Sequence, residues 1–203
     1  MAPEVHPHEG KRVLRQRLRA LRASISEDGR RHSSTALCRL ALRHRLIARG
    51  RRIGFYLPAK GEIDPLPLLN RALWIRVAAF LPEVPARRQR KLWFNRLGKH
   101  PRWQVNRYGI TEYADHRARR VRISALDLVF IPLLGFDRRG YRLGMGGGFY
   151  DASLGYLARR RVWKRPLLIG VAFAVQEVER IPEDAWDIPL DGVLTEQEFL
   201  RFR

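Results

Sequence analysis

Hydrophobic and polar positions recur with a helical period in the N-terminal part of the chain. Over residues 11–23, leucines repeat at three- and four-residue intervals and arginines fill the other positions, which predicts an amphipathic helix. Ser26 is a suitable N-cap for a second helix, which we expect to extend to about Ala48. Asp64 stands directly before a proline and predicts a short third helix that ends near Leu73.

Short apolar runs alternate with these helices and predict β-strands. The run at 126–134 is apolar at nearly every position, which is typical of a strand buried on both faces. Residues 98–122 are polar and irregular. The alternation predicts an α/β fold with one open, largely parallel sheet flanked by helices, in a Rossmann-like three-layer arrangement. The expected strands are 52–58, 75–81 (closed by Pro82), 91–95, 126–134 and 167–173.

The length and composition favour a single folded domain. The chain has 203 residues, of which 45% are hydrophobic, enough for a substantial core. We expect residues 1–10 to form a flexible N-terminus and residues 11–203 to form the domain. Cys38 is the one cysteine, which excludes an internal disulfide. No stretch has the character of a membrane span or secretory signal, so we expect a cytoplasmic protein. We also expect it to be a monomer.

The charge is strongly positive and unevenly distributed. There are 40 lysines and arginines against 20 acidic residues, giving a net charge of +20. Basic residues dominate residues 11–52, whereas acidic residues dominate residues 176–198. A basic face attracts polyanions such as nucleic acid, a nucleotide or a polyglutamylated substrate. Solvated helix arginines explain most of the charge equally well, and no nucleic-acid-binding motif is present, so nucleic acid is expected to bind only nonspecifically.

Candidate chemistry is concentrated at a glycine-rich loop, Gly144–Gly148, between an apolar strand and the helix-like segment 149–154. Backbone N–H groups of such a loop, together with a helix N-terminus, form an anion site. Arg142, which we expect to be an exposed loop arginine, adds donors for phosphate oxygens. Asp151 would either hold a phosphate-bound Mg²⁺ or cap the helix. The alternative is a purely structural turn, which would leave a basic nucleic-acid-binding α/β protein as the rival function.

Two further loops follow predicted strands and are expected on the same rim of the sheet. In the loop 60–64, Asp64 would either cap the third helix or contact a ligand. In the acidic segment 183–191, Asp187 and Asp191 stand among apolar neighbours, which makes a merely solvated turn the weaker explanation. Glu112 would face a substrate or belong to a turn. The three loops together predict one pocket.

Taken in order, these segments resemble the 5-formyltetrahydrofolate cyclo-ligase (5,10-methenyltetrahydrofolate synthetase) family over nearly the whole chain. The stretch Gly140–Asp151 is highly specific to that family, and the others are convincing through their order and spacing. Two positions depart from the family pattern: Tyr113 stands where proline is expected, and Phe149 replaces a frequent tyrosine. The matching segments are Lys11–Arg17, Phe55–Pro58, Gly61–Asp64, Tyr108–Glu112, Pro132–Asp151, Gly170–Phe173, Gln176, Ile181–Pro182, Asp187, Asp191 and Thr195–Glu196.

The resemblance implies cyclisation of 5-formyltetrahydrofolate, with or without a polyglutamate tail, to 5,10-methenyltetrahydrofolate, with ATP as co-substrate and Mg²⁺ as cofactor. The family's mechanism would phosphorylate the formyl oxygen, and N10 would then attack the formyl carbon. Arg142 and Tyr150 would be catalytic, and Asp151 and Asp187 would hold Mg²⁺. Ala59, Glu62, Asp64 and Tyr150 would contact the folate. ATP would be bound by Lys11, Arg12, Arg15, Arg142, Gly144, Met145, Gly146, Gly147, Gly148, Phe149 and Tyr150.

Overall fold

The computed structural model describes residues 10–59, 61–85, 89–98, 102–106, 109, 111–113, 120–159, 166–184 and 186–202. The expected flexible N-terminus therefore lies, except for Gly10, outside the described residues. In this part of the chain no helix combines the length and the apolarity needed to cross a bilayer.

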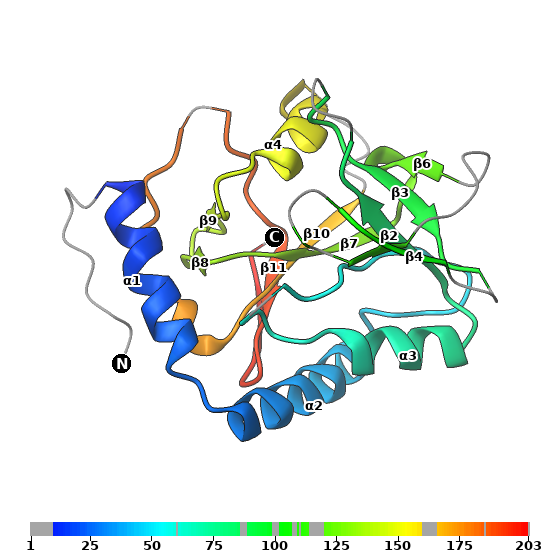
Figure 1. Ribbon diagram of the computed structural model, residues 1–203, viewed down its shortest axis with the longest axis horizontal. Coiled ribbons are helices and arrows are strands. Elements are labelled where there is room, and N and C mark those ends of the chain that lie inside the picture. Colours follow the sequence, from blue (N-terminus) through cyan, green and yellow to red (C-terminus); the bar gives the residue numbers. More distant parts are fainter. Residues whose placement is uncertain are drawn as a thin grey trace.

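An eight-stranded sheet forms the centre of the molecule, in the order β12-β11-β10-β7-β1-β2-β3-β6 (Figure 1). Its five central strands run parallel, and the outer strands β12, β3 and β6 pair antiparallel. The predicted α/β fold with a largely parallel sheet is confirmed. The strands are β1 (Arg52–Gly54), β2 (Ala78–Glu83), β3 (Trp93–Arg96), β6 (Arg120–Arg122), β7 (Leu128–Pro132), β10 (Leu167–Val171), β11 (Gly192–Leu194) and β12 (Phe199–Arg201).

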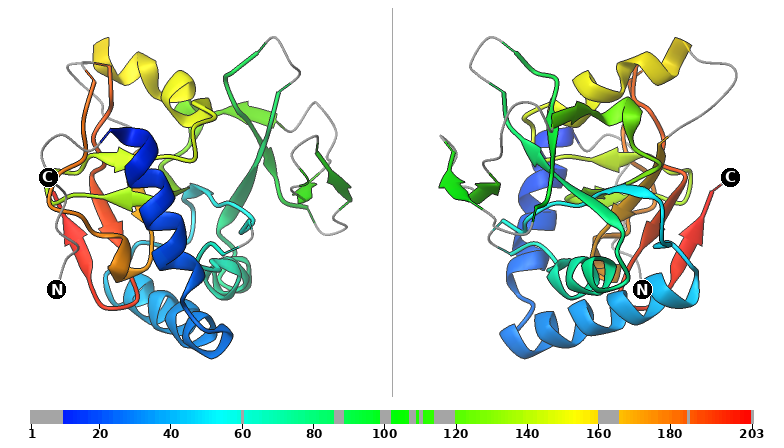
Figure 2. Two further views of the ribbon diagram at one scale, coloured as in Figure 1. Left: turned by 60° about the vertical axis from the view of Figure 1, so that its left-hand side comes forward. Right: turned by 90° about the vertical axis from the view of Figure 1, so that its right-hand side faces the viewer.

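Helices cover both faces of the sheet. The helices α2 (Glu27–Arg43) and α3 (Leu66–Trp74) lie together on one face, while α4 (Phe149–Leu154) lies on the opposite side (Figure 2). Short 3-10 turns are also present at Ile123–Ala125, Gly155–Arg159 and Ala174–Gln176. Leu128, Phe130 and Ile169 point into the core beneath α2 and α3, and the alternate residues Val129 and Ile131 point into the second core. This alternation buries the central strands on both faces, as their continuous apolarity predicts.

Helix α1 (Lys11–Ala23) packs outside these layers, at the edge of the molecule (Figure 1). Its leucines Leu14 and Leu18 form a small separate core with residues that include Leu134 and Leu143. Leu143 belongs to a two-stranded hairpin of β8 (Gly135–Phe136) and β9 (Arg142–Leu143). The amphipathic helix predicted over 11–23 is thus confirmed, and it lies beside the hairpin that leads into the glycine-rich loop.

Several predicted boundaries are wrong for local backbone reasons. The second helix ends at Arg43, not near Ala48, because Arg45 adopts the left-handed region with φ of 52°. The strand expected at 75–81 begins only at Ala78, because α3 continues to Trp74 and Arg76 has φ of 60°.

Two further differences concern the sheet edge. Pro82 lies inside β2 and does not close it, since this end of β2 pairs only with β3 and a missing N–H is tolerated there. The segment 98–122 is also less irregular than expected. It contains β6 and a hairpin of β4 (Trp103–Val105) and β5 (Thr111–Tyr113).

Candidate active site

A cavity of about 500 Å³ opens beyond the carboxyl ends of the central strands β1, β2 and β7. From β1 the chain continues to β2 on one side and later crosses back to β7 on the other side, so the strand order reverses between β1 and β7. Open α/β sheets bind ligands at such a topological switch point. The lining residues are Arg15, Tyr56, Leu57, Ala59, Glu62, Leu81, Pro82, Val84, Leu92, Asn106, Thr111, Glu112, Tyr113, Pro132, Arg142, Gly144, Met145, Gly146, Gly147, Gly148, Phe149, Tyr150 and Asp151.

The glycine-rich loop lines one side of this cavity along its whole length. Gly146 has φ of 106° and Gly148 has φ of 65°, conformations that side chains rarely adopt. A Cβ at Gly147 would approach the Phe149 ring to 2.9 Å, whereas Gly144 has open space at this position. Helix α4 begins directly after Gly148 but has only six residues. The macrodipole of so short a helix is small, and the anion-binding character of the loop rests on its backbone N–H groups and on nearby arginines.

Arg142 precedes the loop and is not the exposed arginine that the sequence suggests. Its side chain is 6% exposed and forms an ion pair with Asp151. Its second nitrogen, Nη1, donates to the carbonyl oxygen of Ile188 at 2.7 Å. The guanidinium thus connects β9, α4 and the acidic segment 183–191. Arg142 also lines the cavity. Asp151 does not cap α4, because Gly148 occupies the N-cap position; Asp151 lies in the first turn and is 46% exposed.

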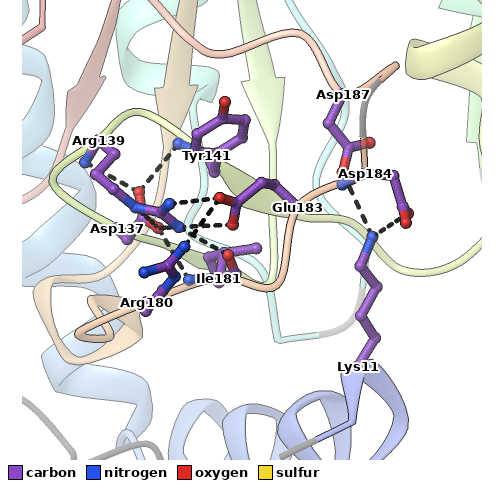
Figure 3. Close-up of polar contacts among 9 residues, drawn as sticks. All are labelled: Lys11, Asp137, Arg139, Tyr141, Arg180, Ile181, Glu183, Asp184 and Asp187. Atoms are coloured by element: carbon purple, nitrogen blue, oxygen red, sulfur yellow. Dashed lines mark hydrogen bonds and ion pairs between the residues drawn. The ribbon is translucent and has the colours of Figure 1, made fainter. Parts of the chain in front are cut away.

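Helix α1 brings one of its three predicted nucleotide-binding residues, Arg15, to the cavity, and Lys11 to the neighbouring acidic segment. Arg15 lines the cavity, and its Nε donates to the carbonyl oxygen of Gly144 at 3.0 Å. Lys11 Nζ lies 2.6 Å from Asp184 and 3.4 Å from Asp187 (Figure 3). Partial burial alone would lower the pKa of Lys11, but the hydrogen bonds and attraction of the two carboxylates outweigh it and raise that pKa. Arg12 is exposed and is not among the cavity-lining residues.

A network of polar contacts around the buried Asp137 holds the hairpin and the acidic segment together (Figure 3). Asp137 is fully buried and accepts the backbone N–H of Ile181 at 2.9 Å. Arg139 Nη2 donates to Asp137 at 2.7 Å, and its Nη1 donates to Glu183 at 2.7 Å. The network fixes the position of the residues that carry Arg142 relative to those that carry Asp187. None of this was predicted, since no local spacing relates Asp137 to Ile181.

Carboxylates and tyrosines also line the cavity. Glu62 Oε2 accepts the backbone N–H of Ala59 at 2.9 Å. Burial raises the pKa of Glu62 above its usual range, although the Ala59 N–H and Arg22 act to lower it. Glu112 lies on β5 and lines the cavity, and its Oε1 accepts the N–H of Val84 at 2.7 Å and Asn106 Nδ2 at 2.9 Å.

Tyr150 lies between the two sides. Its hydroxyl is buried and, within the described part of the chain, has no hydrogen-bond partner. Burial raises the pKa of Tyr150, Glu62 raises it further, and Arg142 opposes the shift. The hydroxyl is therefore protonated at neutral pH and offers a hydrogen-bond donor to a ligand.

Two chemically distinct walls result. The glycine-loop wall consists of Arg15, Arg142, Gly144–Gly148 and Asp151, and the carboxylate wall consists of Tyr56, Ala59, Glu62, Asn106 and Glu112. Neither Tyr56 nor Asn106 was predicted as a site residue. Tyr56 follows the end of β1, where ligands are expected, and this position could have identified it as a site residue from the sequence.

Asp64 and Asp191 occupy structural positions. Asp64 Oδ1 accepts the N–H of Leu66, the first residue of α3, at 2.8 Å, and Asp64 does not line the cavity. Asp191 Oδ2 accepts the N–H of Leu168 at 2.8 Å and thereby joins β10 to the start of β11. Of the two aspartates considered in the acidic segment, Asp187 is the one beside α1.

No metal cluster is preformed among the described residues, since no group of three or more His, Cys, Asp or Glu side chains could hold an ion. Asp151 lines the cavity and pairs with Arg142. Asp187 lies beside Lys11 and, like the other described residues of the segment 183–191, does not line the cavity, contrary to the predicted single pocket. Mg²⁺ needs only one or two protein carboxylates when phosphate oxygens and water complete its octahedron. Asp151 offers one such carboxylate at the cavity, to an ion delivered with a phosphate ligand.

Comparison with known proteins gives a consistent result. The model of the 5-formyltetrahydrofolate cyclo-ligase family matches residues 7–196. The 5-formyltetrahydrofolate cyclo-ligase of Haemophilus influenzae is 30% identical over 184 residues, covering 89% of this chain and 95% of that protein. The Mus musculus 5-formyltetrahydrofolate cyclo-ligase is 29% identical over 190 residues, covering 90% of each. The solved structure of Aquifex aeolicus 5,10-methenyltetrahydrofolate synthetase superimposes with a TM-score of 0.79 at 33% identity, covering 95% of this chain and 93% of that one.

Proposed function

The chain belongs to the 5-formyltetrahydrofolate cyclo-ligase family and is a ligase with that activity, and we propose that it performs the reaction in the cavity between the two walls. Enzymes of this family use ATP as co-substrate. The rival function, a nucleic-acid-binding protein with a structural glycine loop, is set aside because the family match extends over residues 7–196. The observation that carries the proposal is the convergence of the glycine loop, two arginines and the buried Glu62 on one cavity.

The chemistry explains why the reaction consumes ATP. A formamide carbon is a weak electrophile, and its oxygen is a poor leaving group. We propose that the formyl oxygen attacks the γ-phosphorus, which forms a new P–O bond and breaks the bond to ADP. N10 then attacks the activated carbon, the C–O bond breaks, and phosphate leaves with the original formyl oxygen while N10 loses its proton. Such a reaction depends on positioning and on charge stabilisation.

The glycine-loop wall is proposed to bind the ATP phosphates. Arg15, Arg142 and the backbone of Gly144–Gly148 supply donors on one side of the cavity, and Lys11 lies on the same helix as Arg15. Fixed donors of this kind stabilise the charge that develops during phosphoryl transfer without reorganising. Arg12, Met145 and Phe149 remain predictions as ATP contacts, with Met145 and Phe149 supported by their place in the cavity lining.

The carboxylate wall is proposed to bind the folate. Its Glu62 presents a side-chain acceptor, and the reduced pterin ring carries N–H donors that complement a carboxylate. The protonated hydroxyl of Tyr150 is a donor close to both walls and is proposed to hydrogen-bond the substrate near its reacting group. A contact of Asp64 with the folate remains a prediction from the resemblance; the Asp64 carboxylate accepts the N–H of Leu66, and the N-cap position of α3 belongs to Pro65.

Mg²⁺ is proposed to bind together with ATP at Asp151 and Asp187. When bound, the ion would neutralise charge on the phosphates. In the free protein Asp151 is paired with Arg142 and Asp187 with Lys11. Both cations are therefore expected to exchange a carboxylate for a phosphate oxygen when Mg²⁺ and ATP arrive together.

The decisive experiment pairs an absorbance assay with two glycine variants. Formation of the methenyl product extends the conjugated system, so it is followed at near-ultraviolet wavelengths with and without ATP. Gly144 has open space where a Cβ would lie and no positive φ, so Gly144→Ala is expected to fold normally and to obstruct a phosphate on the loop. The same substitution at Gly155, which also has open space but lies outside the cavity, is the control.

A raised KM for ATP in Gly144→Ala, with Gly155→Ala unchanged, would support the phosphate site. Equal behaviour of the two variants would place the phosphates elsewhere. Monomeric state, cytoplasmic location, use of polyglutamylated substrates and nonspecific nucleic-acid binding remain predictions from the sequence.

A further inference from the structure

One buried arginine has no role in the reaction as described above. Arg22 lies near the end of α1 and is 5% exposed, although the neighbouring Arg19 on the same helix is exposed. The other buried residues of α1 are Leu14 and Leu18. Removing a guanidinium from water is costly unless an opposite charge compensates it, so the position of Arg22 requires a partner.

Glu62 faces this arginine. Arg22 Nη1 lies 3.9 Å from Glu62 Oε1, and the two side chains are only 6% and 8% exposed. The other carboxylate oxygen of Glu62 accepts the N–H of Ala59. Glu62 lines the cavity whereas Arg22 does not, so the guanidinium approaches the carboxylate from behind the wall.

A second arginine secures the same loop. Arg30, on α2, donates from Nη1 to the carbonyl oxygen of Gly61 at 2.7 Å and from Nη2 to the carbonyl oxygen of Arg22. Gly61 has φ of 81°, and a Cβ there would lie 3.6 Å from both Arg22 Nε and Arg30 Nη1. The turn that presents Glu62 is thus fixed between the two guanidinium groups.

We propose that Arg22 is a positioning residue for the cyclo-ligase reaction, which keeps Glu62 ionised and directed into the folate side of the cavity from behind. This rests on the proposed contact between Glu62 and the folate. A carboxylate accepts hydrogen bonds without offering a donor, whereas a protonated Glu62 would present its own O–H and lose part of its complementarity to the pterin N–H groups.

The surroundings of Glu62 explain why a cation is needed. Burial raises its pKa, and the Ala59 N–H and Arg22 oppose that shift. The groups that face Glu62 from other elements are Tyr56 after β1 and Tyr150 on α4, both neutral, with Arg30 on the adjacent Gly61 carbonyl. Asp64 is the other carboxylate of the same loop. Arg22 is the cation that lies within ion-pair distance of Glu62 in the described part of the chain.

The test is the pH dependence of 5-formyltetrahydrofolate affinity, measured without ATP in the full-length protein. Arg22→Met removes the charge and preserves a long side chain, and Arg19→Met is the matched control on the exposed side of α1. An adjacent cation lowers a carboxyl pKa by about 1–3 units. Arg22→Met is therefore expected to lose folate affinity at a pH about 1–3 units higher than the wild type. Arg19→Met should follow the wild-type curve. Protonation of the substrate itself affects every variant equally, so it does not contribute to the difference between variant and wild type.

Glu62→Gln separates this proposal from the function on which it rests. If the proposal is right, Glu62→Gln abolishes the loss of folate affinity at low pH, and adding Arg22→Met to this variant causes no further shift. If Arg22→Met weakens folate binding equally at every pH, Arg22 only packs and the proposal is overturned alone. If Glu62→Gln leaves folate affinity and its pH profile unchanged, the proposed contact of Glu62 fails as well. Arg22→Gln replaces Arg22→Met should the latter not fold, and Arg22→Lys, which keeps the charge, is expected to retain a near-wild-type transition.

Discussion

The two walls of the cavity differ in how their charges are held. On the glycine-loop wall, Arg142 is paired with the half-exposed Asp151, and nearby Lys11 is paired with Asp184 and Asp187. On the carboxylate wall, Glu62 and Glu112 are nearly buried and accept backbone N–H groups. The first arrangement can exchange internal carboxylates for phosphate oxygens, and the second is fixed before a ligand arrives. Nucleotide binding must therefore break existing ion pairs, while the folate side is already organised.

The largest expected effect comes from Arg142→Ala on the glycine-loop wall. Loss of one charge-stabilising donor in phosphoryl or acyl transfer costs about 10²- to 10³-fold in kcat, and we expect a loss of that size. The Ile188 carbonyl also loses its buried donor, which should cost about 1–3 kcal/mol of stability. Steady-state kinetics and thermal melting measure the two effects. A folded Arg142→Ala enzyme with normal turnover would remove this residue from the reaction.

Glu62→Gln tests the other wall and is expected to have the next largest effect. The substitution keeps the shape and the acceptor for the Ala59 N–H but removes the charge. Hydrogen bonds to charged groups contribute about 1.5–3 kcal/mol, so KM for the folate should rise about ten- to a hundredfold. KM for ATP should change little. If both constants rise together, the two walls are not functionally separate and the comparison fails.

Asp184→Asn should have a smaller effect, and it should strengthen ATP binding. Asp184 holds Lys11 at 2.6 Å in a half-exposed ion pair, and such pairs contribute about 0–1 kcal/mol. If Lys11 must leave this carboxylate to reach the phosphates, its removal should tighten ATP binding about two- to fivefold. Isothermal titration with ATP and Mg²⁺ provides the measurement. Weaker binding would show that Asp184 supports the site and does not compete for Lys11.

Glu183→Gln is expected to change stability alone. The hydrogen bond from Arg139 lowers the pKa of Glu183 from 4.5 to about 2. A carboxyl group with a lowered folded-state pKa stabilises the protein above its unfolded pKa, and this contribution disappears as the pH falls from 4.5 to about 2. The variant should therefore melt below the wild type at pH 7 and converge with it towards pH 2. Glu179→Gln, at an exposed position four residues earlier in the chain, is the control.

Much of the fold followed from local patterns. The period of the leucines located α1, the capping serine located the start of α2, and continuous apolarity identified β7 and β10 as central strands. The hairpin β4–β5 and the edge strand β6 were not predicted, because their residues are polar or exposed on at least one face. Strand formation at such edges depends on a neighbour that sequence periodicity does not reveal.

The residue types available to the site can be read from the chain alone: the glycines of the loop, Arg142 before it, and Glu62 after β1. How these residues are used depends on the folded arrangement. Folding buries Arg142 against the Ile188 carbonyl, assigns Asp64 and Asp191 to backbone N–H groups, and places Arg22 behind Glu62. Charge and conformational freedom are properties of single residues, whereas burial and pairing join residues far apart in the chain. The electrostatic behaviour of each group follows from those distant partners.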